Sequence, residues 1–186
     1  MKNVKRGIGV MILAISFYAC GKKNPSVPEV GRDTVNQTQD NVKADEDFAK
    51  EAAEGGMYEV MLGELAVKKG SKEIKKLGQM MVDDHGAANA DLKEIAKQKN
   101  IDLPKELGTE KQSIYDGLMS KEGKEFDKEY AHQMVKDHEA DIKKFEKEAN
   151  NGDDPDFKNF ASEKLPTLRH HLEMSKDAKK TCDEHK

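Results

Sequence analysis

Met81-Val82-Asp83-Asp84-His85 recurs in this chain as Met134-Val135-Lys136-Asp137-His138. Each copy lies in a long segment with the apolar spacing of an amphipathic helix, and each histidine takes a position where a core leucine is expected. Burying a polar ring without a partner is costly. The repeat therefore predicts that both histidines meet a carboxylate or a metal inside the fold.

The hydrophobic periodicity predicts an all-α protein, since no segment alternates with the period of a strand. Gly70 stops the first helix, and Asp154-Pro155 gives a cap followed by proline at the start of the last one. Pro166 is expected to interrupt the last helix, because its ring frees the carbonyl of Ser162. The expected long helices cover residues 45–69, 71–99, 124–150 and 154–180, and a short helix covers 109–119.

The long connection over residues 100–123 resembles the single crossover of ferritin-like bundles. If it traverses the bundle, the helices that carry His85 and His138 run parallel and both rings lie at one level. We therefore predict a ferritin-like antiparallel four-helix bundle, with a crossover between its second and third long helices that contains the short helix.

Each long helix places one possible metal ligand on its apolar face. Glu59, His85 and His138 are the expected direct ligands, with His171 as a fourth that lies about one turn out of level. Imidazole and carboxylate suit one transition-metal ion, namely zinc, copper or iron. Asp84 and Asp137 point about 100° away from the adjacent histidines, so we expect them to orient the ligands or bridge helices.

Three interpretations of this centre remain open. In a structural network, Glu59, Asp127 or Tyr130 would hold each histidine by a hydrogen bond and fix the register of the bundle. In a metal site, Met81 and Met134, each four residues before a histidine, would favour copper(I), although methionine is also ordinary core filler. In an interaction module, a protein partner would bind an exposed apolar patch instead.

Several chemistries find little support. Only one Glu-x-x-His sequence occurs, at Glu129–His132, whereas a ferritin di-iron centre needs two. No nucleophile elbow, phosphate loop, dinucleotide fingerprint or zinc-protease motif is present, so the sequence leans away from an enzyme. The net charge is −4, and no basic stripe interleaved with aromatic residues occurs, which argues against nucleic acid as a partner.

The N-terminal segment predicts a place in the cell envelope. A basic start, an apolar stretch over residues 7–18 and then Ala19-Cys20 are typical of a bacterial lipoprotein signal; an ordinary secretory signal is the alternative. We expect a signal peptide over 1–19 and a lipid on Cys20 that anchors the protein, at the outer membrane, through a flexible tether ending at residue 44. The bundle would then cover 45–181, and residues 182–186, with Cys182, would form a frayed tail.

A set of short motifs, in fixed order and spacing, resembles the domain-of-unknown-function 4142 family of bacterial envelope proteins over about residues 46–178. The resemblance implies a ferritin-like bundle and brings no established activity. The motifs are Phe48, Gly55-Gly56-Met57, Glu59-Val60, Leu62-Gly63, Ala66, Asp84-His85, Asn89, Leu92, Phe126-Asp127, Tyr130, Asp137-His138, Phe145-Glu146, Leu165-Pro166 and His171.

Overall fold

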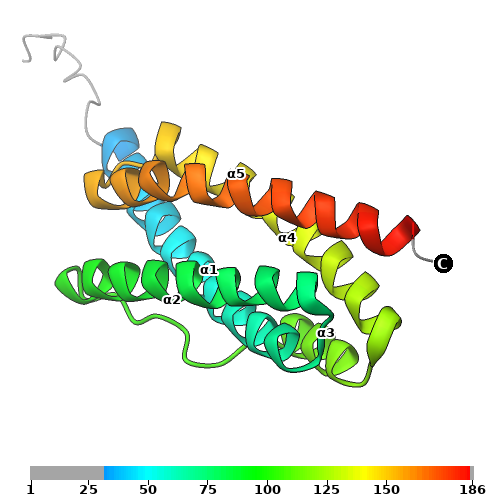
Figure 1. Ribbon diagram of the computed structural model, residues 1–186. Coiled ribbons are helices and arrows are strands. Elements are labelled where there is room, and N and C mark those ends of the chain that lie inside the picture. Colours follow the sequence, from blue (N-terminus) through cyan, green and yellow to red (C-terminus); the bar gives the residue numbers. More distant parts are fainter. Residues whose placement is uncertain (1–31, 185–186) are drawn as a thin grey trace, which may run out of the picture.

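The computed structural model describes residues 32–184, with side chains described from Lys43 onward, and in this part of the chain it is all-helical, as predicted, without a strand. Figure 1 shows two long helix pairs with a short helix at one end. None of the described helices is both long enough and apolar enough to cross a membrane. The helices are α1 (Arg32–Lys69), α2 (Lys72–Gln98), α3 (Thr109–Met119), α4 (Gly123–Asn151) and α5 (Pro155–Glu184).

Helices α1 and α2 form one pair, and their backbones approach closely at two glycines. A Cβ atom built on Gly63 would lie 2.6 Å from the carbonyl oxygen of Gly78. One built on Gly78 would lie 2.7 Å from the Cβ of Ala66. Only residues without a side chain permit this crossing, which sets the spacing between the helices that carry Glu59 and His85.

Helices α4 and α5 form the second pair, and the start of the described part of α1 ties down their connection. The buried carboxylate of Asp45 accepts hydrogen bonds from the backbone N–H groups of Asp153, at 3.2 Å, and Asp154, at 2.7 Å. Nearby, the rings of Phe48 and Phe145 pack edge to face with centroids 5.1 Å apart. These contacts join the two pairs at one end of the molecule.

The connection between α2 and α4 contains the short helix α3, with the bounds that the sequence predicted. Helix α2 ends before Asn100, which has φ 57°, a left-handed conformation that asparagine tolerates. Glu54 on α1 then accepts hydrogen bonds from the backbone of Gly108, at 2.7 Å, and from Lys111, at 3.0 Å. These two bonds hold α3 against α1.

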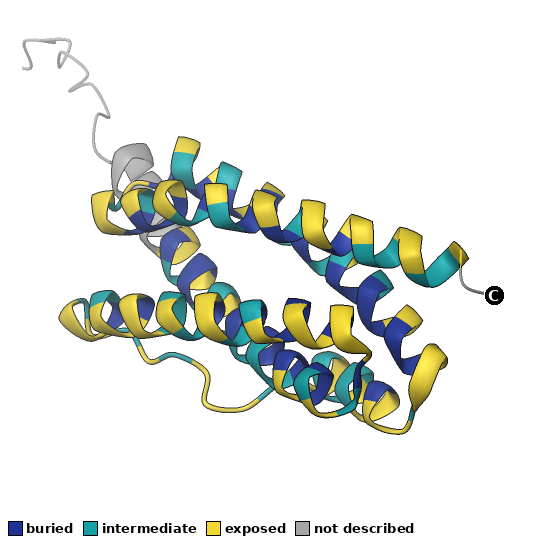
Figure 2. Ribbon diagram, in the orientation of Figure 1, coloured by how far each residue is buried: buried dark blue, intermediate teal, exposed yellow. Residues whose placement is uncertain are grey.

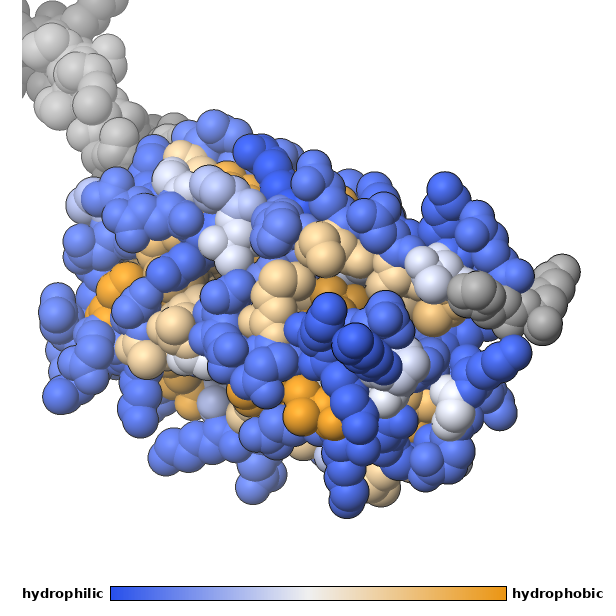
Figure 3. Space-filling model, viewed as in Figure 1, coloured by the Kyte–Doolittle hydropathy of each residue, from blue (hydrophilic) through white to orange (hydrophobic). Residues whose placement is uncertain are grey.

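The buried residues form two apolar clusters, and Figure 2 shows the buried face of each helix turned inward. One cluster contains Met81 and Met134, and the other contains Leu92 and Ile142. The buried histidines of α2 and α4 come between these residues in sequence, so the polar centre separates the two clusters. The face seen in Figure 3 is mostly hydrophilic, and its hydrophobic residues are scattered.

The start of α1, the end of α5 and the course of α5 at Pro166 differ from the sequence-based expectations. Helix α1 begins at Arg32, within the segment expected to be a flexible tether, and α5 continues through Pro166 without a break. Helix α5 also extends to Glu184, so Cys182 lies in a helix and packs half-buried against the core rather than in a frayed tail. The expected signal peptide and Cys20 lie outside the described residues.

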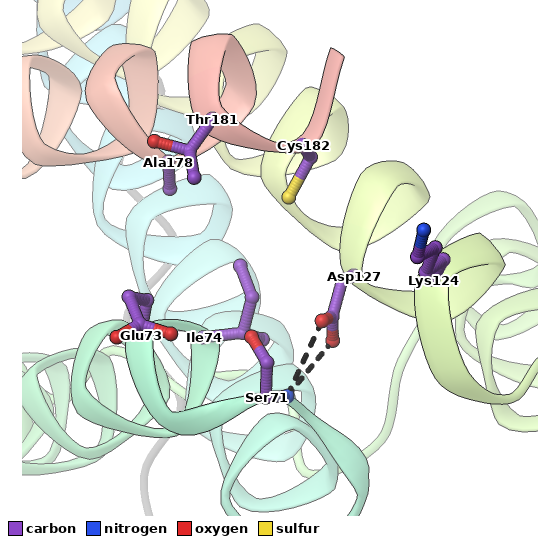
Figure 4. Close-up of a pocket in the computed structure, with 8 residues that line it drawn as sticks. All are labelled: Ser71, Glu73, Ile74, Lys124, Asp127, Ala178, Thr181 and Cys182. Carbon is purple, nitrogen blue, oxygen red and sulfur yellow. Dashed lines mark hydrogen bonds between the residues drawn. The ribbon is translucent and has the colours of Figure 1, made fainter. Parts of the chain in front are cut away.

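Cys182 faces a cavity of about 580 Å³ between the ends of α2, α4 and α5 (Figure 4). On the opposite wall, Asp127 Oδ1 accepts a hydrogen bond from the backbone N–H of Ser71 at 3.0 Å. Asp127 therefore caps the start of α2 from a neighbouring helix. The sequence had suggested a hydrogen bond from a histidine to Asp127, but Asp127 bonds Ser71 instead.

Candidate metal centre

Three histidines from three different helices converge in the interior. Nε2 of His138 on α4 lies 3.4 Å from Nε2 of His85 on α2 and 3.3 Å from Nδ1 of His171 on α5. One nitrogen from each ring can be chosen so that all lie within 4.8 Å of one another. His138 and His171 are fully buried and His85 is 6% exposed. The sequence placed His171 about a turn away, whereas it is a full member of this group.

The other nitrogen of each ring lies close to an oxygen atom. His85 Nδ1 lies 3.1 Å from Oε2 of Glu59, and His171 Nε2 lies 2.8 Å from Oδ2 of Asp84. His138 Nδ1 lies 2.9 Å from the backbone carbonyl oxygen of Met134, one turn earlier. A neutral imidazole carries a single N–H, and these oxygen atoms favour the tautomer in which that N–H points outward on each ring. The three inward nitrogens then present lone pairs to one another.

The environment keeps the rings neutral. Burial, followed by the neighbouring histidines, lowers the pKa of His85 well below its usual value. Burial and the proximity of His171 lower the pKa of His138 to about 4, and burial also lowers that of His171 despite its bond to Asp84. Each ring is therefore neutral at neutral pH and carries a single N–H. With all three N–H groups outward, the inward lone pairs at 3.4 and 3.3 Å would face one another, and a cation between them would be the partner that buried polar atoms require.

A metal ion meets this requirement in both chemistry and size. Zinc binds imidazole nitrogen at about 2.0–2.1 Å with tetrahedral angles, which places two ligand nitrogens about 3.3–3.4 Å apart. The His138 separations of 3.4 and 3.3 Å agree with this value. Outward bonds to carboxylates and a backbone carbonyl are also the usual way in which proteins orient metal-binding histidines.

Glu59 lies away from the three converging nitrogens. It was expected to bind the metal directly, but its carboxylate contacts the outward nitrogens, His85 Nδ1 at 3.1 Å and His138 Nδ1 at 3.4 Å. Burial, followed by Asp141 and Asp137, raises its pKa well above the usual carboxyl value. Glu59 thus lies beside the Nδ1 atoms of His85 and His138, and its Oε1 atom has no hydrogen-bond partner within the described structure.

The remaining predicted residues lie at different distances from the histidines. Asp84 holds His171, as described above, whereas Asp137 accepts a hydrogen bond from Gln133 at 2.8 Å. Burial raises the pKa of Asp137 to about 6. Tyr130 is buried and stacks on Phe126 with centroids 5.9 Å apart, and its hydroxyl has no hydrogen-bond partner among residues 32–184.

Sequence reasoning missed two participants. The Met134 carbonyl carries no side-chain signal, although its position four residues before His138 on a helix makes the contact possible. Asp141 lies one turn after Asp137, and this spacing could have placed it on the same face of α4. His132 of the lone Glu-x-x-His sequence lies elsewhere, 3.1 Å from Asp183 near the end of α5.

A small cavity adjoins the centre. It has a volume of about 30 Å³ and is lined by Glu59, His85 and Asn89 among others. A water molecule needs about 10–15 Å³ of such space and several polar partners. The cavity therefore has room for a water beside His85.

The fold and the site define an all-helical protein with a buried cluster of three histidines backed by carboxylates. The family model described as "Domain of unknown function (DUF4142)" matches residues 31–178. The chain therefore belongs to the DUF4142 family. Comparisons with curated proteins and with solved structures gave no match.

Proposed function

We propose that this protein binds one transition-metal ion through His85 Nε2, His138 Nε2 and His171 Nδ1. The observation that supports the proposal is the convergence of three neutral rings whose outward nitrogens already have acceptors. A purely structural network would be expected to place a proton between the inward nitrogens. Here a cation is the species that satisfies all three at once.

Zinc is the metal that this donor set favours. Three imidazoles and one open position for water form a common zinc arrangement, with tetrahedral angles. Copper(I) is the competing ion, because Met81 and Met134 lie one turn before His85 and His138 and supply soft thioether groups. Iron would prefer a carboxylate among its direct ligands, and Glu59 instead lies behind the rings.

We place this metal-binding domain in the cell envelope. The four long helices form a ferritin-like antiparallel bundle, with α3 in the crossover. A lipid on Cys20 anchors the chain to the outer membrane. The support for the anchor is the order of basic start, apolar stretch, small residue and cysteine in residues 1–20. The proposed function is thus that of a membrane-anchored metal-binding protein.

The test is metal content. The untagged full chain is exposed separately to zinc, copper, iron and manganese salts, desalted and analysed by mass spectrometry. We expect near-stoichiometric retention of one metal by the native chain and loss of that metal in His85→Ala and His138→Ala. His170→Ala is the matched control, because His170 is exposed and adjacent in sequence to His171.

Retention by His170→Ala but not by the other two variants would assign the metal to the buried cluster. Absence of every metal from the native chain would overturn the proposal and leave the histidines as a buried polar network. The anchor is tested separately by labelling cells with a radioactive fatty acid. Label is expected on the native protein and should be lost in Cys20→Ala; equal labelling of both would contradict the anchor.

A further inference from the structure

A second cavity connects the surface to the back of the histidine cluster. It has a volume of about 220 Å³ and lies where α1, α3 and α4 meet. Exposed residues of α3 and α4, including Glu110 and Lys136, line its outer part, and the buried Glu59 lines its inner part. Glu59 also lines the 30 Å³ cavity beside His85. The same carboxylate therefore borders both spaces.

Two carboxylates on α4 line this route. Asp137 and Asp141 are one turn apart on the same helix face, and both lie against the cavity. Gly55 on α1 lies beside the second of them, and a Cβ built there would be in ordinary contact with Oδ2 of Asp141, at 3.8 Å. The cavity thus has two acidic groups in its lining in addition to Glu59 and Glu110.

One oxygen atom of the buried Glu59 side chain has no hydrogen-bond partner in the described part of the chain. Glu59 is 1% exposed, and its Oε2 atom is engaged with His85. Its Oε1 atom lies 3.4 Å from His138 Nδ1, which already donates to Met134, and has no hydrogen-bond partner in the described part of the chain. A buried, unpartnered carboxylate oxygen at the end of a polar cavity is a site for a cation.

Three lysines, Lys111, Lys136 and Lys144, line this cavity together with the carboxylates. Lys111 is bound to Glu54 at 3.0 Å, outside the cavity lining. Lys144 lies 3.2 Å from Glu51, also outside the lining, and is farther from Asp141, at 3.8 Å. The remaining cavity lysine, Lys136, is exposed to solvent. Each carboxylate therefore has lysine charge nearby, and Lys144 is the lysine in contact with Asp141.

We propose that this cavity is the route by which the metal ion reaches the histidines, with Asp137 and Asp141 as a transient binding site and Glu59 as the last oxygen contact. This inference rests on the proposed metal-binding function. A hydrated divalent cation is attracted first to carboxylates, which are hard oxygen ligands. It then exchanges water for the softer imidazole nitrogens.

The experiment measures loading kinetics with cobalt(II), whose visible absorption reports nitrogen coordination, mixed with the metal-free full chain in a stopped-flow instrument. Asp137→Asn combined with Asp141→Asn is expected to slow association by about tenfold. Dissociation should slow by a similar factor, so the equilibrium Kd changes little, because a route lowers the barrier in both directions. Lys144→Gln, which removes the positive charge 3.8 Å from Asp141, should speed association.

The matched control is Asp83→Asn combined with Glu139→Gln, which removes the same charge from exposed positions on α2 and α4. It should bind cobalt at close to the native rate. Equal rates in the control and the Asp137/Asp141 variant would overturn the route, and so would a weaker Kd at an unchanged association rate. Failure of the native chain to bind cobalt or zinc would overturn the metal site itself, which is a distinguishable result.

Discussion

Oε2 of Glu59 lies 3.1 Å from Nδ1 of His85, on the side of the ring away from the other two histidines. This contact favours the tautomer of His85 in which Nδ1 carries the proton and Nε2 is free to bind a cation. Glu59, which the sequence suggested as a direct metal ligand, would thus orient the ligand His85 instead.

Glu59→Gln should weaken metal binding about 10- to 100-fold without abolishing it, because the amide holds the His85 N–H less strongly than a carboxylate does. The metal-free protein should be as stable as the native chain or more so, since a buried carboxyl group is removed. Competition with a chelator of known affinity measures the first effect, and urea denaturation measures the second. A complete loss of binding would instead make Glu59 a direct ligand.

Asp84→Ala should lower metal affinity by about tenfold, because it removes the acceptor that orients His171. Its neighbour provides the control. Asp83 is exposed and accepts a hydrogen bond from Gln79 at 2.9 Å, so Asp83→Ala should bind metal like the native chain. Calorimetric titration of both variants makes the comparison. Similar affinities in the two would show that the His171 contact does not contribute.

Glu148 should make the stability of the protein depend on pH. Burial, followed by the proximity of Asp45, raises the pKa of Glu148 from 4.5 to about 7. Between these values the unfolded chain releases the proton and the folded chain keeps it, so folding loses stability as the pH rises through this window. The loss levels off above pH 7, when both states are ionised.

The measurement compares the native chain with Glu148→Gln by urea denaturation at several pH values between 4 and 8. The variant should become more stable than the native chain by about 2 kcal/mol as the pH rises from 4.5 to 7. A stability difference that stays constant across this range would contradict the raised pKa. The difference between the two proteins isolates Glu148 from other titrating groups, the buried histidines included.

The closest contact between α1 and α2 should not tolerate a methyl group. Gly63→Ala is expected to destabilise the protein by about 1–3 kcal/mol, because its Cβ would lie 2.6 Å from a backbone oxygen that cannot move easily. Gly86→Ala on α2 is the control. Its Cβ would meet nothing within 4 Å, so it should stabilise the helix by about 0.5–1 kcal/mol. Thermal denaturation of both variants checks the opposite signs.

Much of the fold could be predicted from the sequence, because helical signals are local. Apolar residues at helical spacing, Gly70 and Asp154-Pro155 predicted the helix boundaries within the core of the chain, and the short helix α3 has its predicted bounds. The observed start of α1 and end of α5 differ from the expected bounds. Polar composition predicted a tether and a frayed tail, but α1 begins at Arg32 and Cys182 packs against the core.

For the site, the repeated Met-Val-x-Asp-His segment and the helical period were enough to predict that Glu59, His85, His138 and His171 are turned inward, and all four are buried. The helical period predicts only which face of its helix a side chain lies on. Contacts among four helices determine which ring nitrogen faces the centre. They also place Glu59 beside Nδ1 of His85 and Asp127 at the start of α2. Only the tertiary structure decided these, because ring orientation is set by partners that are far apart in the sequence.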